Sequence, residues 1–341
     1  MVKRIAALSA VLVAVPAGVV LGTAGVANAA GGFPAVAFHA AGDDLWTLTN
    51  GNGKTYGAQV ADGTSPAITT TQSGYDIQVA FQNRSGILQM VGSTTGYGGQ
   101  AMASGTSPSI TEIQPPSTPE GQYIRSGWQA AFQNAAGNLQ TVGFLRPREF
   151  SLGMAPGTSP AIASLANGND GLPHWQVAMQ ANTGNLITVG DFSLPQDTGF
   201  GMAAGTSPAI ARLPQGGYVI AFQANNGRLY TTGSQGARDW GVGMRPGTSP
   251  SIATVNALGS IQIAFQSDAG DLWTVGAAGT RNWQLQMDPR SSPSIGQVPG
   301  VGLELAFTSA GGELWTVGDI GNQNWSLGVA PGTSPSIITG N

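Results

Sequence analysis

The residues best suited to chemistry in this sequence are aromatic and recur in pairs. The two members of a pair are ten residues apart, and the pairs are Trp46/Tyr56, Tyr230/Trp240, Trp273/Trp283 and Trp315/Trp325. A half-exposed ring can stack on the flat apolar face of a pyranose, while neighbouring amides and carboxylates bond to the hydroxyls. These residues are therefore the candidate carbohydrate-binding residues. The alternative interpretation is that they are cross-strand packing pairs.

Catalytic and metal-binding patterns find little support. Cysteine is absent and histidine occurs only as His39 and His174, which are too distant to form a metal site of the usual kind. No Gly-x-Ser-x-Gly motif is present. The 17 acidic residues leave open a carboxylate pair for glycoside hydrolysis, and Glu304 stands out because other copies of its segment carry Gln. We predict no catalytic residue, no metal and no cofactor, and keep a glycoside hydrolase as an alternative.

The composition limits the partners and the fold. Only 9% of the residues are charged, and no basic run occurs, which argues against binding nucleic acid through its phosphates. A hydrophobic content of 41% is too high for a chain that stays unfolded. The 52 Gly and 21 Pro residues divide the chain into pieces too short for a helical protein.

The first residues have the features of a secretory signal peptide. Lys3 and Arg4 precede an apolar stretch over residues 5–21, and Ala27-Asn28-Ala29 has the small-x-small pattern that signal peptidase cleaves. We predict a signal peptide over residues 1–29, cleavage near Ala29 and secretion of residues 30–341. No second apolar run of about 20 residues follows, so membrane insertion is not expected.

The rest of the chain is one unit repeated seven times. The dipeptide Ser-Pro marks the copies, and it begins at Ser65, Ser107, Ser159, Ser207, Ser249, Ser292 and Ser334. Each copy holds four short segments, and the clearest of them, residues 261–266, alternates apolar and polar side chains as a strand does. Four strands in each of seven copies predict an all-β fold, a seven-bladed β-propeller of antiparallel strands that forms a single domain over residues 30–341.

The phase of the repeat predicts how the ring closes. The chain enters its first copy one strand late, at residues 36–39, and ends with the missing segment at residues 334–338. The C-terminal strand should therefore pair into the first blade, which hides two exposed strand edges. Closure makes the copies with aromatic pairs, numbers 1, 5, 6 and 7, consecutive neighbours. Gln89 and Gln140 replace the first aromatic residue of the pair in two of the other copies.

The unit resembles a known repeat. The order Leu-Gly-Met, Gly-Thr-Ser-Pro-Ser-Ile, Ala-Phe-Gln, Gly-x-Leu-Trp-Thr and a later Trp resembles the repeat of bacterial propeller lectins of the Photorhabdus lectin type, over about residues 35–341. It is also similar to propeller modules of secreted bacterial hydrolases. The resemblance implies a seven-bladed ring that binds fucose-like sugars in shallow pockets between blades.

These patterns together predict a secreted, multivalent, lectin-like protein with glycans as its partners and shallow sites at or between the blades. Two alternatives from other classes remain. One is a protein-interaction scaffold at the cell surface, which would show a continuous apolar patch on one face. The other is a propeller-fold glycoside hydrolase, which would show convergent carboxylates at one end of the central channel.

Overall fold

Each copy of the repeat folds into one four-stranded antiparallel sheet, which we call a blade. The computed structural model describes residues 34–71, 76–94, 98–114, 127–145, 147–165, 172–298 and 300–338, and within these ranges lie 28 strands and no helix. By internal contacts the chain divides into Met1–Ala30 and Gly31–Asn341, and every strand belongs to the second unit. The predicted signal peptide and its cleavage site near Ala29 lie outside the described residues.

The blades are numbered in chain order, and each is listed from its inner to its outer strand. Blade 1 consists of β28 (Ser336–Ile338), β1 (Ala35–His39), β2 (Asp44–Thr49) and β3 (Asn52–Gln59), and blade 2 of β4 (Ala67–Thr71), β5 (Asp76–Gln82), β6 (Ile87–Gly92) and β7 (Gly98–Ala101). Blade 3 consists of β8 (Ser109–Ile113), β9 (Gly127–Gln133), β10 (Asn138–Gly143) and β11 (Arg148–Gly153), and blade 4 of β12 (Ala161–Ser164), β13 (Trp175–Gln180), β14 (Asn185–Gly190) and β15 (Gln196–Gly201). Blade 5 consists of β16 (Ala209–Arg212), β17 (Tyr218–Gln223), β18 (Arg228–Gly233) and β19 (Arg238–Gly243). Blade 6 consists of β20 (Ser251–Thr254), β21 (Ile261–Gln266), β22 (Asp271–Gly276) and β23 (Arg281–Gln286), and blade 7 of β24 (Ser294–Val298), β25 (Gly302–Thr308), β26 (Glu313–Gly318) and β27 (Gln323–Gly328).

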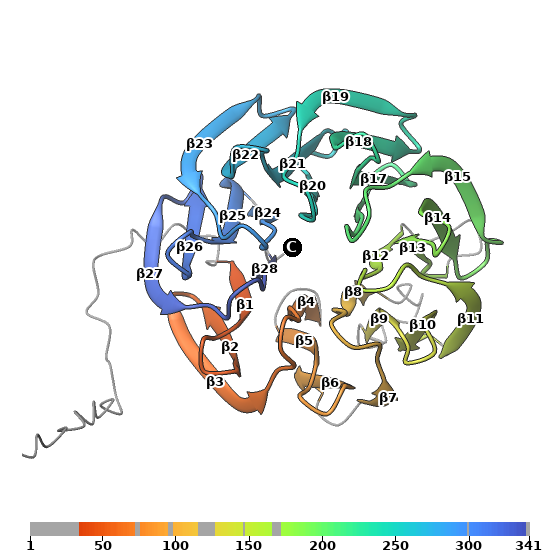
Figure 1. The fold of residues 1–341 in the computed structure, drawn as a ribbon, viewed down its shortest axis with the longest axis horizontal. Helices are drawn as coiled ribbons and strands as arrows, with labels where there is room; N and C mark the ends of the chain where they lie inside the picture. Colours follow the sequence, from red (N-terminus) through yellow and green to blue (C-terminus); the bar gives the residue numbers. More distant parts are fainter. Residues whose placement is uncertain are drawn as a thin grey trace, which may run out of the picture. The chain divides into compact units, whose positions relative to one another are not determined.

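The blades are arranged around a central axis, with the first strand of each blade innermost and the fourth outermost (Figure 1). This confirms the predicted seven-bladed β-propeller. Ring closure is confirmed as well, because β28 pairs with β1 through Ala37↔Ser336, Val36↔Ile337 and Ala35↔Ile338. Among the described residues, no helix is long and apolar enough to cross a membrane.

The core lies between the blades because each sheet has two apolar faces. In β21, Ile261, Ile263 and Phe265 point toward blade 5, whereas Ala264 packs on the opposite face toward blade 7. The second strand of six blades carries a fully buried phenylalanine, and these are Phe38, Phe81, Phe132, Phe222, Phe265 and Phe307. Burying such a side chain contributes about 1.5–3 kcal/mol, so the stacked phenylalanines hold neighbouring blades together.

The Gly-Thr-Ser-Pro motif joins the blades around the axis. The backbone N–H of each serine donates to the Oγ of the next serine at 2.8–2.9 Å, and the ring runs through Ser65, Ser107, Ser159, Ser207, Ser249, Ser292, Ser334 and back to Ser65. The residue before this serine is a fully buried threonine in six copies and Ser291 in the remaining one, and it bonds within its own turn, as Thr64 Oγ1 does by donating to the Ala61 carbonyl at 2.7 Å. The motif is therefore structural.

Candidate functional site

The first ring of each aromatic pair lies on the third strand and packs against the buried phenylalanine of the second strand. Trp273 opposes Phe265 in the register of β21 and β22, and their ring centroids are 6.5 Å apart. The same contact, at 6.0–6.3 Å, joins Trp46 to Phe38, Tyr230 to Phe222 and Trp315 to Phe307. All four rings are half-buried, so each is fixed on one side and accessible on the other.

The second ring lies on the outer strand and points to the opposite face of its blade. The indole N–H of Trp283 donates to Thr274 Oγ1 at 3.2 Å, and Thr274 adjoins Trp273 on β22, so the two tryptophans lie on different faces. Trp240 and Trp325 donate to Thr231 and Thr316 at 3.1 and 3.0 Å, and Thr47 Oγ1 lies 3.5 Å from the Tyr56 hydroxyl. The two rings of a pair therefore lie on opposite faces of their blade and do not pack against each other across the strands.

The rings regroup between blades. Trp240 of blade 5 and Trp273 of blade 6 pack against one cluster, as do Trp283 of blade 6 and Trp315 of blade 7. Trp325 of blade 7 and Trp46 of blade 1 share a third cluster across the closure. Three successive inter-blade interfaces thus hold two half-buried tryptophans each.

The two remaining aromatic candidates lie at the ends of this sector and have different neighbours. Tyr230 faces blade 4, where Phe200 lies 6.5 Å from it. Tyr56 faces blade 2, where Gln89 stands in place of an aromatic residue. In blade 4 the position of Trp283 is held by Thr198, and Phe200, two residues later, supplies the ring.

Cations cover the outer-strand rings. The guanidinium carbons of Arg281 and Arg238 lie 3.6 and 3.8 Å from the ring centroids of Trp283 and Trp240. Lys54 Nζ lies 4.6 Å above Tyr56, and Arg148 lies 4.4 Å above Phe150. These cations are not among the residues predicted from the sequence. Their signal is a basic residue two positions before the ring, which the two-residue period of a strand places on the same face.

A bulge in the outer strand orients its aromatic residue. Asn282 opposes Trp273, and the Gln284 backbone N–H donates to Asn282 Oδ1 at 2.7 Å, with Gln284 at φ +56°. In blade 5 the Gly241 N–H donates to Asp239 at 2.8 Å, and this bond is the main reason why the pKa of Asp239 lies below its usual value. The Asn-Trp or Asp-Trp dipeptide thus builds a local turn that directs the indole to the next blade.

Carboxylates stand beside the third-strand tryptophans. Asp271 lies two residues before Trp273 on the same strand face and accepts hydrogen bonds from Gln286 Nε2 and Asn282 Nδ2. Glu313 lies in the same position before Trp315 and accepts from Asn324 Nδ2 at 2.8 Å. The interfaces 5/6 and 6/7 therefore each contain two indoles, one guanidinium and one carboxylate-amide cluster.

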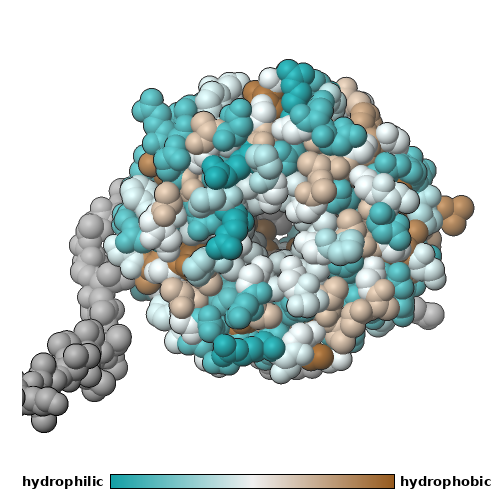
Figure 2. All heavy atoms as spheres, in the orientation of Figure 1, coloured by the Kyte–Doolittle hydropathy of each residue, from teal (hydrophilic) through white to brown (hydrophobic). Residues whose placement is uncertain are grey.

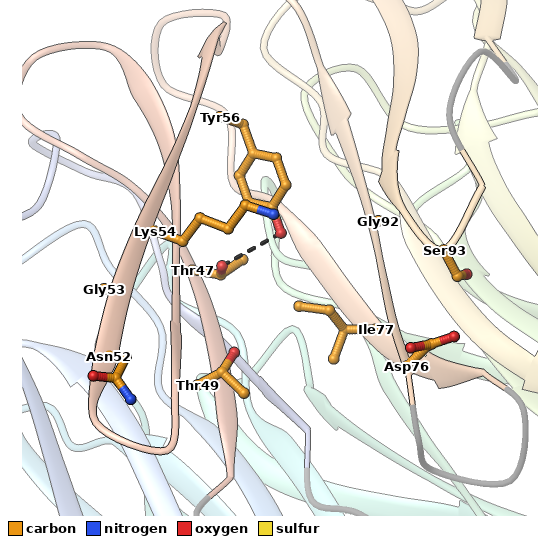
Figure 3. A pocket seen from close by; sticks show the side chains of 10 residues that line it. All are labelled: Thr47, Thr49, Asn52, Gly53, Lys54, Tyr56, Asp76, Ile77, Gly92 and Ser93. Atoms are coloured by element: carbon orange, nitrogen blue, oxygen red, sulfur yellow. Dashed lines mark hydrogen bonds between the residues drawn. The ribbon is translucent and has the colours of Figure 1, made fainter.

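A pocket of about 420 Å³ opens between blades 1 and 2. It contains one of the predicted aromatic residues, Tyr56 (Figure 3). The other lining residues are Thr47, Thr49, Asn52, Gly53 and Lys54 of blade 1 and Asp76, Ile77, Gly92 and Ser93 of blade 2. Ammonium, carboxylate, hydroxyl and amide groups thus surround a phenol ring.

The described residues contain no group of three His, Asp or Glu side chains that could hold a metal. Glu304 is fully buried, which raises its pKa to about 8 and removes it from solvent. His39 is buried where other blades carry Gln, with Nδ1 3.2 Å from the Thr64 carbonyl oxygen. Both residues are variants of repeat positions.

Comparisons with known proteins identify the fold. No protein-family model matches the chain, and no curated protein matches it. Among solved structures, a fungal lectin from Aleuria aurantia, described as a six-bladed β-propeller with fucose recognition, matches with a TM-score of 0.55 and 12% identity, over 78% of this chain and 95% of that chain. A mutant of the same lectin bound to Fucα1-6GlcNAc matches with a TM-score of 0.54 and 12% identity over the same shares. AofleA from Arthrobotrys oligospora matches with a TM-score of 0.54 and 14% identity, over 84% of this chain and 92% of that chain.

At such low identity the likeness establishes the architecture alone. The chain shares its fold with propeller lectins, although the Aleuria lectin has six blades and this chain has seven. The resemblance to lectins of the Photorhabdus type and to hydrolase modules stays a hypothesis.

Proposed function

We propose that the protein is a secreted, multivalent carbohydrate-binding protein whose sites lie at the interfaces between blades 5 and 6, 6 and 7, and 7 and 1. The observation that carries the proposal is the regrouping of the tryptophans into inter-blade sets. A ring needed only for packing would recur in all seven blades, whereas these sets are confined to one sector and stay half-exposed.

The chemistry of the sets suits sugar hydroxyls. An indole offers a flat apolar face, a guanidinium offers several N–H donors, and a carboxylate accepts from hydroxyl groups. At interface 6/7 these groups are Trp315, Arg281 and Glu313. The shared fold with fucose-binding lectins of fungi supports the same function.

Arg281 provides the most direct test because its side chain is exposed and stacks on the Trp283 ring. The full chain is applied to a glycan array, and the best glycan is then titrated into Arg281→Ala and into Arg212→Ala, an exposed arginine of the aromatic-poor inner strand β16. We expect the Arg281 variant to bind more weakly while both variants keep the same melting temperature. Absence of glycan binding by the unaltered chain would overturn the proposal.

A second candidate function is supported by exposed apolar side chains on blades 3 and 4. Phe144 follows β10 and is 48% exposed, and Phe192 and Leu194 follow β14 and are 76% and 81% exposed. On the face that Figure 2 shows, hydrophilic, neutral and moderately hydrophobic residues are interspersed around the central opening. Exposed apolar groups of this size favour protein contact. A Phe192→Ser/Leu194→Ser variant that keeps full glycan binding but loses binding to a protein partner captured by the unaltered chain would support this second function.

A further inference from the structure

Blade 1 departs from the repeat at the pocket that it shares with blade 2. In the other six blades the third strand ends in glycine, at Gly92, Gly143, Gly190, Gly233, Gly276 and Gly318. At Gly276 a Cβ would lie 2.3 Å from the Ile261 carbonyl oxygen, so the standard blade cannot carry a side chain there. Blade 1 has Thr49 in this position.

A different hairpin makes room for Thr49. The turn Asn50-Gly51 has φ values of +50° and +75°, which are typical of the tight turn that joins two regular strands. The pairing of β2 and β3 therefore continues through Leu48↔Gly53 and Thr49↔Asn52, whereas the corresponding pairing in blade 6 stops at Thr274↔Arg281.

This extension forms one wall of the pocket. Thr49, Asn52 and Gly53 all line it, and all belong to the two strand pairs that only this hairpin adds. The ring closes in the other six blades without such an extension, so the fold does not require it. The volume of about 420 Å³ falls in the range of roughly 300–1,000 Å³ that small-molecule sites have.

The charges of the pocket define what it would hold. Lys54 Nζ is exposed above the Tyr56 ring, and it forms no ion pair with a carboxylate of the described residues. An ammonium group on a partly enclosed wall attracts an anion. Asp76 stands on the opposite wall, where a carboxylate accepts hydrogen bonds from hydroxyls (Figure 3).

We propose that the pocket between blades 1 and 2 binds an anionic sugar residue of the uronic acid class, a specificity that rests on the proposed carbohydrate-binding function. The sugar carboxylate pairs with Lys54 Nζ, and the ring hydroxyls bond to Thr49, Asn52 and Asp76. The pocket differs from the tryptophan interfaces in its aromatic group and in its walls. It has one phenol ring in place of two indoles, and it has an additional polar wall.

The test compares sugars that differ only at one carbon. The full chain is titrated with the methyl glycosides of glucuronic and galacturonic acid and with those of glucose and galactose, with binding followed by NMR or calorimetry. We expect at least one acidic sugar to bind about tenfold or more tightly than its neutral parent, as one charge-assisted hydrogen bond gives. Raising the salt concentration should weaken the binding of the acidic sugar and leave the binding of the neutral sugar unchanged.

Two variants assign the preference to the pocket. Lys54→Met keeps an apolar stem over Tyr56 and removes the charge, and it should abolish the preference for the acidic sugar. Arg212→Met removes an exposed cation of the inner strand β16, outside the pocket and the tryptophan interfaces, and should leave the preference unchanged. Equal binding of acidic and neutral sugars by the unaltered chain, or an intact preference in Lys54→Met, would overturn the proposal. If the array shows neutral glycans that depend on Arg281 while the acidic preference is absent, the proposed function stands and the anionic site alone fails.

Discussion

The backbone N–H of Ser334 donates a 2.9 Å hydrogen bond to the Oγ of Ser65, a residue 269 positions away in the chain. This bond completes the circle of serine contacts, and the pairing of β28 with β1 follows directly after it. Blade 1 is thus built from both ends of the described chain, so the ring is held closed by hydrogen bonds at two successive points.

Removal of the closing strand should destabilise the whole ring. A chain that ends after Pro335 lacks β28 and leaves β1 without its inner partner. We expect the free energy of unfolding to fall by several kcal/mol out of the roughly 5–15 kcal/mol that hold a domain together, with a clear drop in melting temperature by circular dichroism. A chain that ends after Ile338 keeps β28 and serves as the control. Equal melting of the two truncated chains would contradict this role of β28.

Glu304 should make stability depend on pH. Burial is the main cause that raises its pKa from 4.5 to about 8, the nearby Asp319 carboxylate adds to it, and a hydrogen bond from the Ile320 N–H opposes it. Because the folded pKa lies above the unfolded one, the folded state binds the proton more tightly. Its stabilising contribution is therefore complete below about pH 4.5, is lost progressively as the pH rises toward about 8, and stays absent above that.

The variant Glu304→Gln isolates this effect. Gln262 occupies the same position in blade 6, where its Oε1 accepts from the Ala278 N–H and its Nε2 donates to the Gly279 carbonyl, each at 2.9 Å. We expect the variant to unfold at higher urea concentration than the unaltered chain at pH 9 and at nearly the same concentration at pH 4. The difference at pH 9 should reach several kcal/mol, since each pKa unit corresponds to about 1.4 kcal/mol. A difference that is constant between these pH values would show that Glu304 does not titrate in this range.

The sequence predicts the fold well because the repeat itself encodes it. Seven copies of four alternating segments define the blades, and the late start at residues 36–39 defines the closure that Ala37↔Ser336 confirms. The sequence identifies the candidate aromatic residues, but it does not show which rings lie next to each other in the fold. Counting ten residues from Trp273 finds Trp283, yet the strand register places Asn282 opposite Trp273, so Trp283, one residue further on, points to the far face. Strand register and blade stacking decide which rings meet, and neither is visible in residue spacing.

The pocket illustrates a signal that is present in the sequence but has meaning only in three dimensions. Thr49, followed by Asn50-Gly51, replaces the glycine that ends the third strand in the other blades. In the sequence this is one irregular copy among seven. In the structure it extends a hairpin and adds a polar wall next to Lys54.

Two glycines with left-handed φ should respond differently to alanine. Gly241 has φ +71° and open space where a Cβ would lie, so Gly241→Ala should lower the free energy of unfolding only through backbone strain, by about 1 kcal/mol. Gly276 has φ +148°, and its Cβ would meet the backbone of Ile261, so Gly276→Ala adds a steric clash and should lose about 2–4 kcal/mol. Urea unfolding of both variants measures the difference. Equal losses would show that the blade can move away from the added Cβ.

The three tryptophan interfaces should act as separate sites on one rigid scaffold. Trp273, Trp315 and Trp46 each supply the third-strand ring of a different interface, between blades 5 and 6, 6 and 7, and 7 and 1. Calorimetric titration of a soluble glycan into Trp273→Ala, Trp315→Ala or Trp46→Ala should therefore show one binding site fewer in each case. Retention on a glycan-coated surface should fall much more steeply, because linked sites multiply apparent affinity by about 10²–10⁴. Gln140→Ala, at the same strand position of blade 3, should change neither quantity.

Each tryptophan variant should also keep a melting temperature close to that of the unaltered chain. Its ring is half-buried, so its loss should cost less than the roughly 3–5 kcal/mol of a core tryptophan. A large drop in melting temperature, with glycan binding lost only in proportion to folding, would identify the rings as packing residues. Undiminished binding by the triple variant would place the sugar sites elsewhere on the ring.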